Sequence, residues 1–297
     1  MKTLLTGASG FVGTFMQQRI GCFPLSTSGH EIDLRDLDRL RSFVAEKRPD
    51  AVIHLASQSF VPASFERPRE TYDINFLGTF NLLTALRDCG FRGRMLHVGS
   101  GDAYGLVPEA LLPIGEDQPL RPRSPYAVSK VAAEALCYQW SQTESFELMM
   151  SRSFNQIGPG QSDRFAVSDF AKQIVEIKLG RREPVLSVGD IDVTRDFTDV
   201  RDATVAYASL LERGVNGEVY NVCSGVERSL RFVLERLLDL SGVNARIAQV
   251  GDRLRKAEQR RTVGSFAKLH RATGWEPTTP VDTSLRDILN HWEKQLS

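Results

Sequence analysis

The 297-residue chain has few cysteines and no excess charge of either sign, with 37 Lys and Arg residues against 37 Asp and Glu residues. Its four cysteines are far apart and form no C-x-x-C pair, so we expect neither a metal site nor a disulfide framework. A zero net charge without a basic block argues against a nucleic-acid partner and against binding to a membrane surface.

Long hydrophobic runs are also missing, since none approaches the ~18 residues that a transmembrane helix needs. The chain passes from Met1 directly into a glycine-rich turn at Gly7, which leaves no room for a signal peptide. A cytoplasmic protein is therefore expected. With 297 residues, of which 41% are hydrophobic, the chain is long enough for one large domain or two unequal lobes.

Short apolar runs alternate with helical stretches through the first half of the chain. The pattern predicts strands and helices in turn at residues 3–6, 11–20, 22–25, 37–47, 51–55, 74–89, 95–98, 125–143 and 147–152. Such alternation is typical of βαβ crossovers. We therefore expect an α/β fold with a doubly wound parallel sheet of the Rossmann type.

This rhythm changes after the strand predicted at 147–152. Residues 155–164 are rich in Gly, Pro, Gln and Asp, which predicts a loop, and further helices are expected at 165–179, 229–241 and 282–294. We interpret this part as a smaller α/β lobe. The expected division places residues 1–160, with a return segment at about 196–225, in the first lobe and residues 161–195 and 226–297 in the second.

The first chemical motif is the G-x-x-G-x-x-G of Gly7, Gly10 and Gly13, between a predicted strand and a predicted helix. Glycine lets the backbone turn sharply and approach a pyrophosphate, and a helix N-terminus offers it unpaired N–H groups. The alternative is an ordinary tight turn, but strand, turn and helix agree here. We therefore expect residues 1–160 to bind a dinucleotide, with Phe11 and Val12 of the motif in the same site.

The second predicted strand ends in Leu25-Ser26-Thr27, without the carboxylate that would bind the ribose 2′-hydroxyl of NAD. Hydroxyl groups tolerate a 2′-phosphate, so Ser26 favours NADP(H), with NAD(H) as the alternative. Asp33 lies about twenty residues after the glycine turn and is a second candidate for the ribose. We prefer an adenine contact for Asp33 and Leu34, and the other interpretation is an ordinary loop before a helix.

The second motif is the Y-x-x-x-K of Tyr126 and Lys130, on the helix predicted to begin at Pro125. Residues four apart share a helical face, so we expect the ammonium group to lower the pKa of the phenol. Such a tyrosine exchanges a proton with an alcohol while a nicotinamide exchanges hydride with its carbon. The spacing also occurs on solvated helices, but the loop from Ser100 to Asp102 after a predicted strand makes it specific.

Together, these residues resemble the extended short-chain dehydrogenase/reductase family over the whole chain. The resemblance implies that Ser100 polarises the reacting oxygen, that Tyr126 is the acid/base and that Lys130 assists Tyr126 and the nicotinamide ribose. It also implies that the coenzyme is flanked or supported by Leu55, Ala56, Ser57 and Asn75. For Asn75 the alternative is a residue near a helix N-terminus that packs on a neighbouring loop.

The second lobe resembles nucleotide-sugar enzymes, in which an arginine like Arg195 clamps a diphosphate. Arg255 and Glu258 resemble the R-x-x-E of members that modify GDP-mannose, where they meet phosphate and ribose, although the spacing also fits a solvated pair. The resemblance adds substrate contacts from Ser59, Asn155 and Gln156. Asp169 and Lys172 are candidates for the guanine edge, with an exposed ion pair as the alternative.

Within the family, the run from Ser100 to Asp102 favours a reductase. A 4,6-dehydratase places Thr-x-Glu here, and aspartate is shorter by ~1.5 Å than the glutamate that must reach the C5 proton. The resemblance implies reduction of the C4 ketone of GDP-4-dehydro-6-deoxy-D-mannose to GDP-D-rhamnose, with Asp102 orienting the sugar or retaining a trace of dehydratase activity. A GDP-mannose 4,6-dehydratase and a non-catalytic NAD(P)-binding sensor are the alternatives. The resemblance also implies a homodimer through the helices at 74–89 and 125–143.

Overall fold

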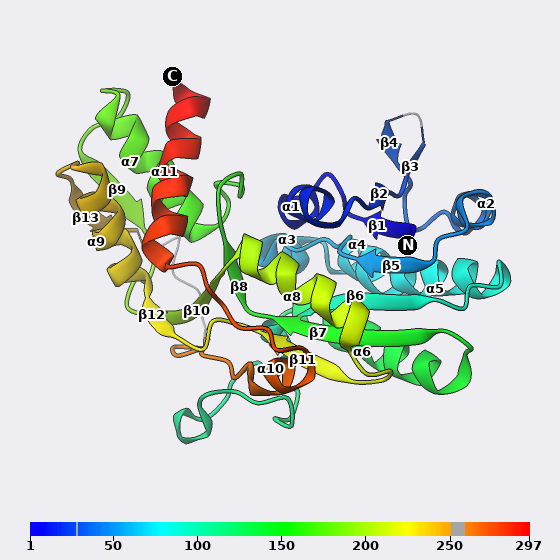
Figure 1. The fold of residues 1–297 in the computed structure, drawn as a ribbon. Coiled ribbons are helices and arrows are strands. Elements are labelled where there is room, and N and C mark those ends of the chain that lie inside the picture. The colour runs from blue at the N-terminus through cyan, green and yellow to red at the C-terminus, as the bar shows by residue number, and fades with distance from the viewer. Residues whose placement is uncertain (28, 251–258) are drawn as a thin grey trace.

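The computed structural model describes residues 1–27, 29–250 and 259–297. Its main sheet has six parallel strands in the order β11-β7-β6-β5-β1-β2 (Figure 1). In chain order these strands are β1 (Thr3–Thr6), β2 (Phe23–Pro24), β5 (Ala51–His54), β6 (Arg94–Ser100), β7 (Glu147–Ser153) and β11 (Val219–Val222). In this order β2 lies on one side of β1, and β5, the next strand of the sheet along the chain, lies on the other side. This reversal creates a crevice at the carboxyl ends of β1 and β5.

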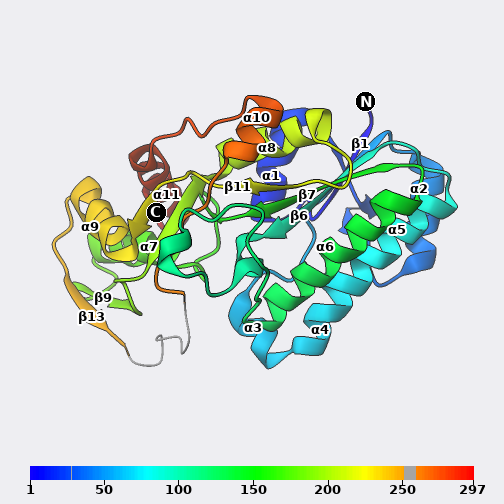
Figure 2. The same ribbon diagram turned by 90° about the horizontal axis from the view of Figure 1, so that it is seen from below.

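Helices cover both faces of the main sheet, as the sequence predicts (Figure 2). One face carries α2 (Leu37–Lys47), α5 (Gly78–Asp88) and α6 (Pro125–Thr143), and the other carries α1 (Phe11–Ile20), α8 (Val200–Arg213) and α10 (Ala267–Thr273). Successive strand residues point to opposite faces, so Leu4 belongs to the first core and Leu5 to the second. Both side chains are fully buried, as expected of a strand covered on two sides.

Two local features of this half differ from the predicted elements. The strand predicted at 22–25 is interrupted, and the chain forms a hairpin of β3 (Ser26–Thr27) and β4 (His30–Glu31). The helix predicted at 74–89 is preceded by α3 (Val61–Glu66) and α4 (Pro68–Tyr72), and begins with a π-helical turn at Asp73–Leu77. Such turns are often found at functional sites. Two 3₁₀ turns follow, at Gly101–Tyr104 and Glu109–Leu111.

The smaller part of the molecule lies beside the carboxyl ends of the main sheet (Figure 1). Three strands, β8 (Asn155–Ile157), β10 (Thr194–Asp199) and β12 (Glu227–Ser229), form one small sheet, and β9 (Val185–Val188) pairs with β13 (Arg246–Gln249). A separate core joins α7 (Ala166–Lys178), α9 (Leu230–Ser241) and α11 (Val281–Leu296). The loop prediction for 155–164 is wrong for 155–157, because these residues pair with a strand forty positions later that local composition does not reveal.

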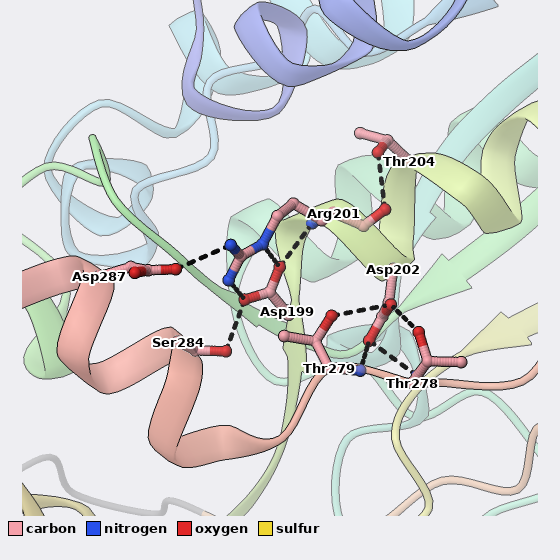
Figure 3. Close-up of polar contacts among 8 residues, drawn as sticks. All are labelled: Asp199, Arg201, Asp202, Thr204, Thr278, Thr279, Ser284 and Asp287. Carbon is pink, nitrogen blue, oxygen red and sulfur yellow. Dashed lines mark hydrogen bonds and ion pairs between the residues drawn. The ribbon is translucent and has the colours of Figure 1, made fainter.

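A polar cluster fastens the C-terminal segment to the start of α8 (Figure 3). Asp199 accepts hydrogen bonds from the backbone N–H of Arg201 at 2.8 Å and from the Ser284 hydroxyl of α11 at 2.5 Å. Arg201 in turn pairs with Asp287 of α11 at 2.7 Å. The Asp202 carboxylate accepts four hydrogen bonds, at 2.8–3.1 Å, from the N–H and hydroxyl groups of two threonines, Thr278 and Thr279. These contacts fix α11 against the end of β10, which borders the crevice.

None of the helices in residues 1–27, 29–250 and 259–297 has the length and hydropathy needed to cross a membrane.

Candidate active site

The crevice is a cleft of about 1630 Å³ that runs from the glycine turn to the small sheet. Most candidate residues from the sequence line it: Gly7, Gly10, Phe11, Val12, Gly13, Asp33, Leu34, Leu55, Ala56, Ser57, Ser59, Ser100, Asp102, Tyr126, Lys130, Asn155, Gln156, Asp169 and Arg195. Of the described candidates, Ser26, Asn75 and Lys172 lie outside this lining. Arg255 and Glu258 lie outside the described residues.

The glycine turn leaves no space for side chains. Gly7 adopts φ +67°, and a Cβ added there would lie 2.8 Å from the Ala56 nitrogen. A Cβ on Gly13 would lie 2.1 Å from the Gly7 carbonyl oxygen. No side chain among the described residues caps the N-terminus of α1, and its first turn carries no acidic residue. The first N–H groups of α1 therefore face the cleft as an anion site, which fits the pyrophosphate of a dinucleotide.

Ser100, Tyr126 and Lys130 meet at the centre of the cleft, although β6 and α6 lie apart in sequence. Ser124 caps α6 by accepting a hydrogen bond from the Ala127 N–H at 3.0 Å, which sets the start of the helix just before Tyr126. The Lys130 Nζ donates to the Val98 carbonyl oxygen at 2.9 Å and lies 6.0 Å from the centroid of the Tyr126 ring. All three side chains are at least nine-tenths buried.

Burial controls the charge of both motif residues. It raises the pKa of Tyr126, the nearby charge of Asp102 raises it further, and the hydrogen bond with Ser100 opposes both effects. This direction is opposite to the lowering predicted from the Y-x-x-x-K spacing. The prediction was wrong because burial destabilises the phenolate more than an ammonium group at this distance stabilises it. Burial also lowers the pKa of Lys130, to about 8.

Asn75 does not line the cleft, but it binds residues of two elements that do. Its side-chain nitrogen donates to the Ser129 hydroxyl at 2.9 Å and to the Gln58 carbonyl oxygen at 3.0 Å, and its oxygen accepts from the Gln58 N–H at 2.8 Å. Ser129 donates in turn to the Tyr126 carbonyl oxygen at 2.6 Å. The π-helical turn thus connects the loop after β5 to α6.

The far end of the cleft is rich in hydrogen-bonding groups. Gln156 donates to the Tyr207 hydroxyl, which also bonds Ser153 at 2.7 Å. The amide oxygens of Gln156 and Gln161 are buried and have no hydrogen-bond partner among the described residues. Arg195 donates from one nitrogen to the Thr194 and Gln259 carbonyl oxygens, at 2.6 and 3.0 Å. These groups fit a polar ligand such as a sugar diphosphate.

Asp169 and Lys172, the two guanine candidates, each contact a further side chain. The Lys172 Nζ pairs with Asp163 at 2.7 Å and lies over the Trp292 ring, 5.4 Å from its centroid. Asp169 accepts a hydrogen bond from Gln173 at 2.8 Å and reaches the cleft.

Two charged residues at the glycine end of the cleft, Glu31 and Arg35, were not predicted from the sequence, and both line the cleft. The hairpin of β3 and β4 carries Glu31 back to the glycine turn, where it accepts a hydrogen bond from the Ser9 N–H at 2.9 Å. Arg35 pairs with Asp33 at 2.5 Å. Gly29, between short polar runs, is the one sequence signal for this hairpin, and its φ is +80°.

Comparisons with known proteins agree with this geometry. The family model of GDP-mannose 4,6 dehydratase matches residues 24–288. The chain is 48% identical over 299 residues to GDP-6-deoxy-D-mannose reductase from Pseudomonas aeruginosa, across 99% of this chain and 98% of that protein. A solved structure of RMD from Pseudomonas aeruginosa complexed with NADPH has a TM-score of 0.93 at 47% identity, covering 99% of this chain and 100% of that one.

A more distant solved structure is UDP-glucose 4-epimerase from Thermus thermophilus in complex with NAD. It matches with a TM-score of 0.85 at 29% identity, over 98% of this chain and 99% of that one. Both solved structures share the parallel sheet and flanking helices of this chain. With a cleft built on the glycine turn and on Tyr126 and Lys130, the chain belongs to the GDP-mannose 4,6 dehydratase family of extended short-chain dehydrogenases/reductases.

Proposed function

We propose that this protein reduces the C4 ketone of GDP-4-dehydro-6-deoxy-D-mannose to GDP-D-rhamnose with NAD(P)H. The observation that carries the proposal is the 48% identity to GDP-6-deoxy-D-mannose reductase over nearly the whole length of both chains. The buried Ser100, Tyr126 and Lys130 supply the groups that such a reduction needs.

When bound, a reduced nicotinamide supplies the hydride for C4. Ser100 donates a hydrogen bond to the ketone oxygen and so polarises it. The raised pKa of Tyr126 keeps its proton in place at neutral pH, ready for transfer to that oxygen. The Lys130 ammonium group stabilises the phenolate that remains, from the same helical face.

For the coenzyme, we assign the pyrophosphate to the glycine turn and the start of α1. We assign the adenosine to Asp33 and Leu34 and the nicotinamide half to the residues after β5, which all line the cleft: Leu55, Ala56 and Ser57. Ser26, the candidate for the 2′-phosphate, lies opposite Glu31 of this lining. Asn75 supports this loop through Gln58. NADPH is the favoured donor, as in the solved relative, and NADH is the alternative.

For the substrate, we assign residues 161–195 and 226–297 to the GDP-sugar, and residues 1–160 with a return segment at about 196–225 to the coenzyme. The proposed substrate contacts are Ser59, Asn155, Gln156, Asp169, Lys172, Arg195, Arg255 and Glu258. The partnerless amide oxygen of Gln156 supports this assignment, because a sugar hydroxyl would satisfy it.

A GDP-mannose 4,6-dehydratase is the second candidate, because the chain belongs to a family named for it. Asp102 lines the cleft and would have to act as its C5 base. We propose that Asp102 instead orients the C6 end of the sugar, since its side chain is one methylene shorter than glutamate. A dehydratase shows no net loss of NAD(P)H, whereas a reductase consumes one equivalent for each ketone.

The test is to follow NADPH absorbance with purified protein and enzymatically generated GDP-4-dehydro-6-deoxy-D-mannose, with GDP-mannose as the control substrate. NMR of the product then distinguishes GDP-D-rhamnose from its C4 epimer, GDP-6-deoxy-D-talose. Oxidation of NADPH by the keto sugar alone supports the proposal. We also propose that the reaction takes place in the cytoplasm.

We also propose that the protein is a homodimer. Large apolar side chains are exposed on the outer surface of the π-helical turn, α5 and α6: Leu77, Phe80, Val128 and Tyr138. A second copy of the same surface would cover them in a symmetric helical interface.

A further inference from the structure

The hairpin after β2 brings a carboxylate to the coenzyme end of the cleft. Its strands pair in antiparallel register, with Glu31 directly opposite Ser26. Directly opposed residues project to the same face of such a pair, so Glu31 lies beside Ser26, whose hydroxyl is predicted to contact the coenzyme. The Leu25 N–H donates to the Leu5 carbonyl oxygen at 2.8 Å, and the Ile32 N–H donates to Leu25 at 3.0 Å. These bonds hold the hairpin against the end of β1.

The carboxylate of Glu31 is oriented by the glycine turn itself. Its Oε1 accepts the Ser9 N–H at 2.9 Å, and Glu31, Ser9 and Gly7 all line the cleft. The second oxygen, Oε2, has no hydrogen-bond partner among the described residues. An acceptor at this point, next to the glycine turn and Asp33, faces the place where the adenosine ribose of a dinucleotide would lie.

Within the described part of the chain, the neighbouring cations pair with other groups and form no ion pair with this carboxylate. The Arg35 guanidinium donates to both Asp33 oxygens, at distances of 2.5 to 3.0 Å. Arg39 reaches the Thr27 hydroxyl at 3.5 Å, from the opposite face of the hairpin. The charge of Glu31 therefore acts on whatever occupies the ribose position.

We propose that Glu31 sets the coenzyme selectivity of this protein, by accepting a hydrogen bond from the ribose 2′-hydroxyl of NADH and repelling the 2′-phosphate of NADPH. The inference rests on the proposed function only in that the cleft binds a nicotinamide dinucleotide. The Ser26 hydroxyl, on the same face as Glu31, tolerates the 2′-phosphate of NADPH, and Glu31 opposes it, so we expect the chain to use both coenzymes. Discrimination of this kind combines an attraction for one ligand with a repulsion against its competitor.

Isothermal titration calorimetry of NADH, NADPH and adenosine 2′,5′-bisphosphate, without any sugar nucleotide, tests the proposal. Glu31→Gln removes the charge but keeps an oxygen that can accept the Ser9 N–H. We expect the ratio Kd(NADH)/Kd(NADPH) to rise by about tenfold or more, and adenosine 2′,5′-bisphosphate to bind more tightly. Glu31→Ala should shift the ratio in the same direction. Glu46→Gln removes an equal charge from an exposed position on α2 and should leave the ratio unchanged.

If Glu31→Gln and Glu31→Ala keep the wild-type ratio Kd(NADH)/Kd(NADPH) and the wild-type unfolding temperature, the inference is overturned. Glu31 would then only hold the hairpin against the glycine turn. If the ratio shifts but the wild-type protein does not reduce the keto sugar, the inference stands and the proposed reduction fails. If the wild-type protein binds neither coenzyme, both are overturned.

Discussion

At the scale of single residues, the central feature is a phenol that keeps its proton. Tyr126 is largely buried, and burial raises its pKa although Lys130 lies nearby. A neutral phenol is the correct starting form for protonating a ketone oxygen during reduction. The direction of the pKa shift therefore agrees with a reductase operating at neutral pH.

Replacing this phenol tests its role directly. Tyr126→Phe should lower kcat for the keto sugar by roughly 10²–10⁴-fold, because the proton donor is lost. Calorimetry should show an almost unchanged Kd for NADPH. Tyr138→Phe makes the same change at an exposed position of α6 and should keep full activity. Normal turnover by Tyr126→Phe would show that another group supplies the proton.

The lowered pKa of Lys130 predicts a pH dependence. The buried ammonium group loses its proton near pH 8, well below the ordinary value of 10.5, whereas the pKa of Tyr126 is raised. We therefore expect kcat/KM for the keto sugar to fall as the pH rises through about 8, because the charge that stabilises the phenolate disappears. Lys130→Met should be slower and should show no such fall between pH 7 and 9. A flat wild-type profile over this range would contradict the assignment.

At the scale of secondary structure, local patterns predicted the elements that bear the motifs. The glycine turn and α1, and Tyr126 and Lys130 on α6, follow from short-range spacing alone. The features that local patterns did not predict depend on contacts between residues far apart in the sequence. Asn155 joins a strand through Phe197, and Glu31 reaches the cleft only because the chain turns back at Gly29. The raised pKa of Tyr126 likewise depends on burial by the whole fold.

The cluster at the start of α8 predicts how the C-terminal segment is held. Asp202→Ala leaves the N–H groups of Thr278 and Thr279 without their buried acceptor, so we expect a loss of about 2–4 kcal/mol in the free energy of unfolding. Urea denaturation followed by circular dichroism measures this loss. Asp239→Ala, at an exposed position of α9, should change stability by less than about 0.5 kcal/mol. If Asp202→Ala also lost less than about 0.5 kcal/mol in the free energy of unfolding, the cluster would add no measurable stability.

At the scale of the whole molecule, the cleft lies between the main sheet and the smaller sheets, so both parts contribute to one site (Figure 1). The coenzyme end is formed by the glycine turn, and the opposite end is formed by β8, β10 and α7. Figure 2 shows α5 and α6 side by side, and the exposed apolar side chains on these helices form the surface that we propose for the dimer.

The proposed dimer predicts a specific effect of charge on this surface. Tyr138 is 55% exposed, and Tyr138→Glu should convert the dimer to a monomer in size-exclusion chromatography with light scattering, because a buried carboxylate is costly. Phe232→Glu, at an exposed position of α9, should leave the dimer intact. A wild-type monomer at micromolar concentration would contradict the proposed interface.

The most direct test of the account is the stoichiometry of NADPH oxidation with each sugar nucleotide. We predict one NADPH oxidised for each GDP-4-dehydro-6-deoxy-D-mannose consumed, and no oxidation with GDP-mannose alone. Slow conversion of GDP-mannose without net loss of NADPH, together with no reaction of the keto sugar, would contradict the reductase and identify Asp102 as the C5 base of a dehydratase.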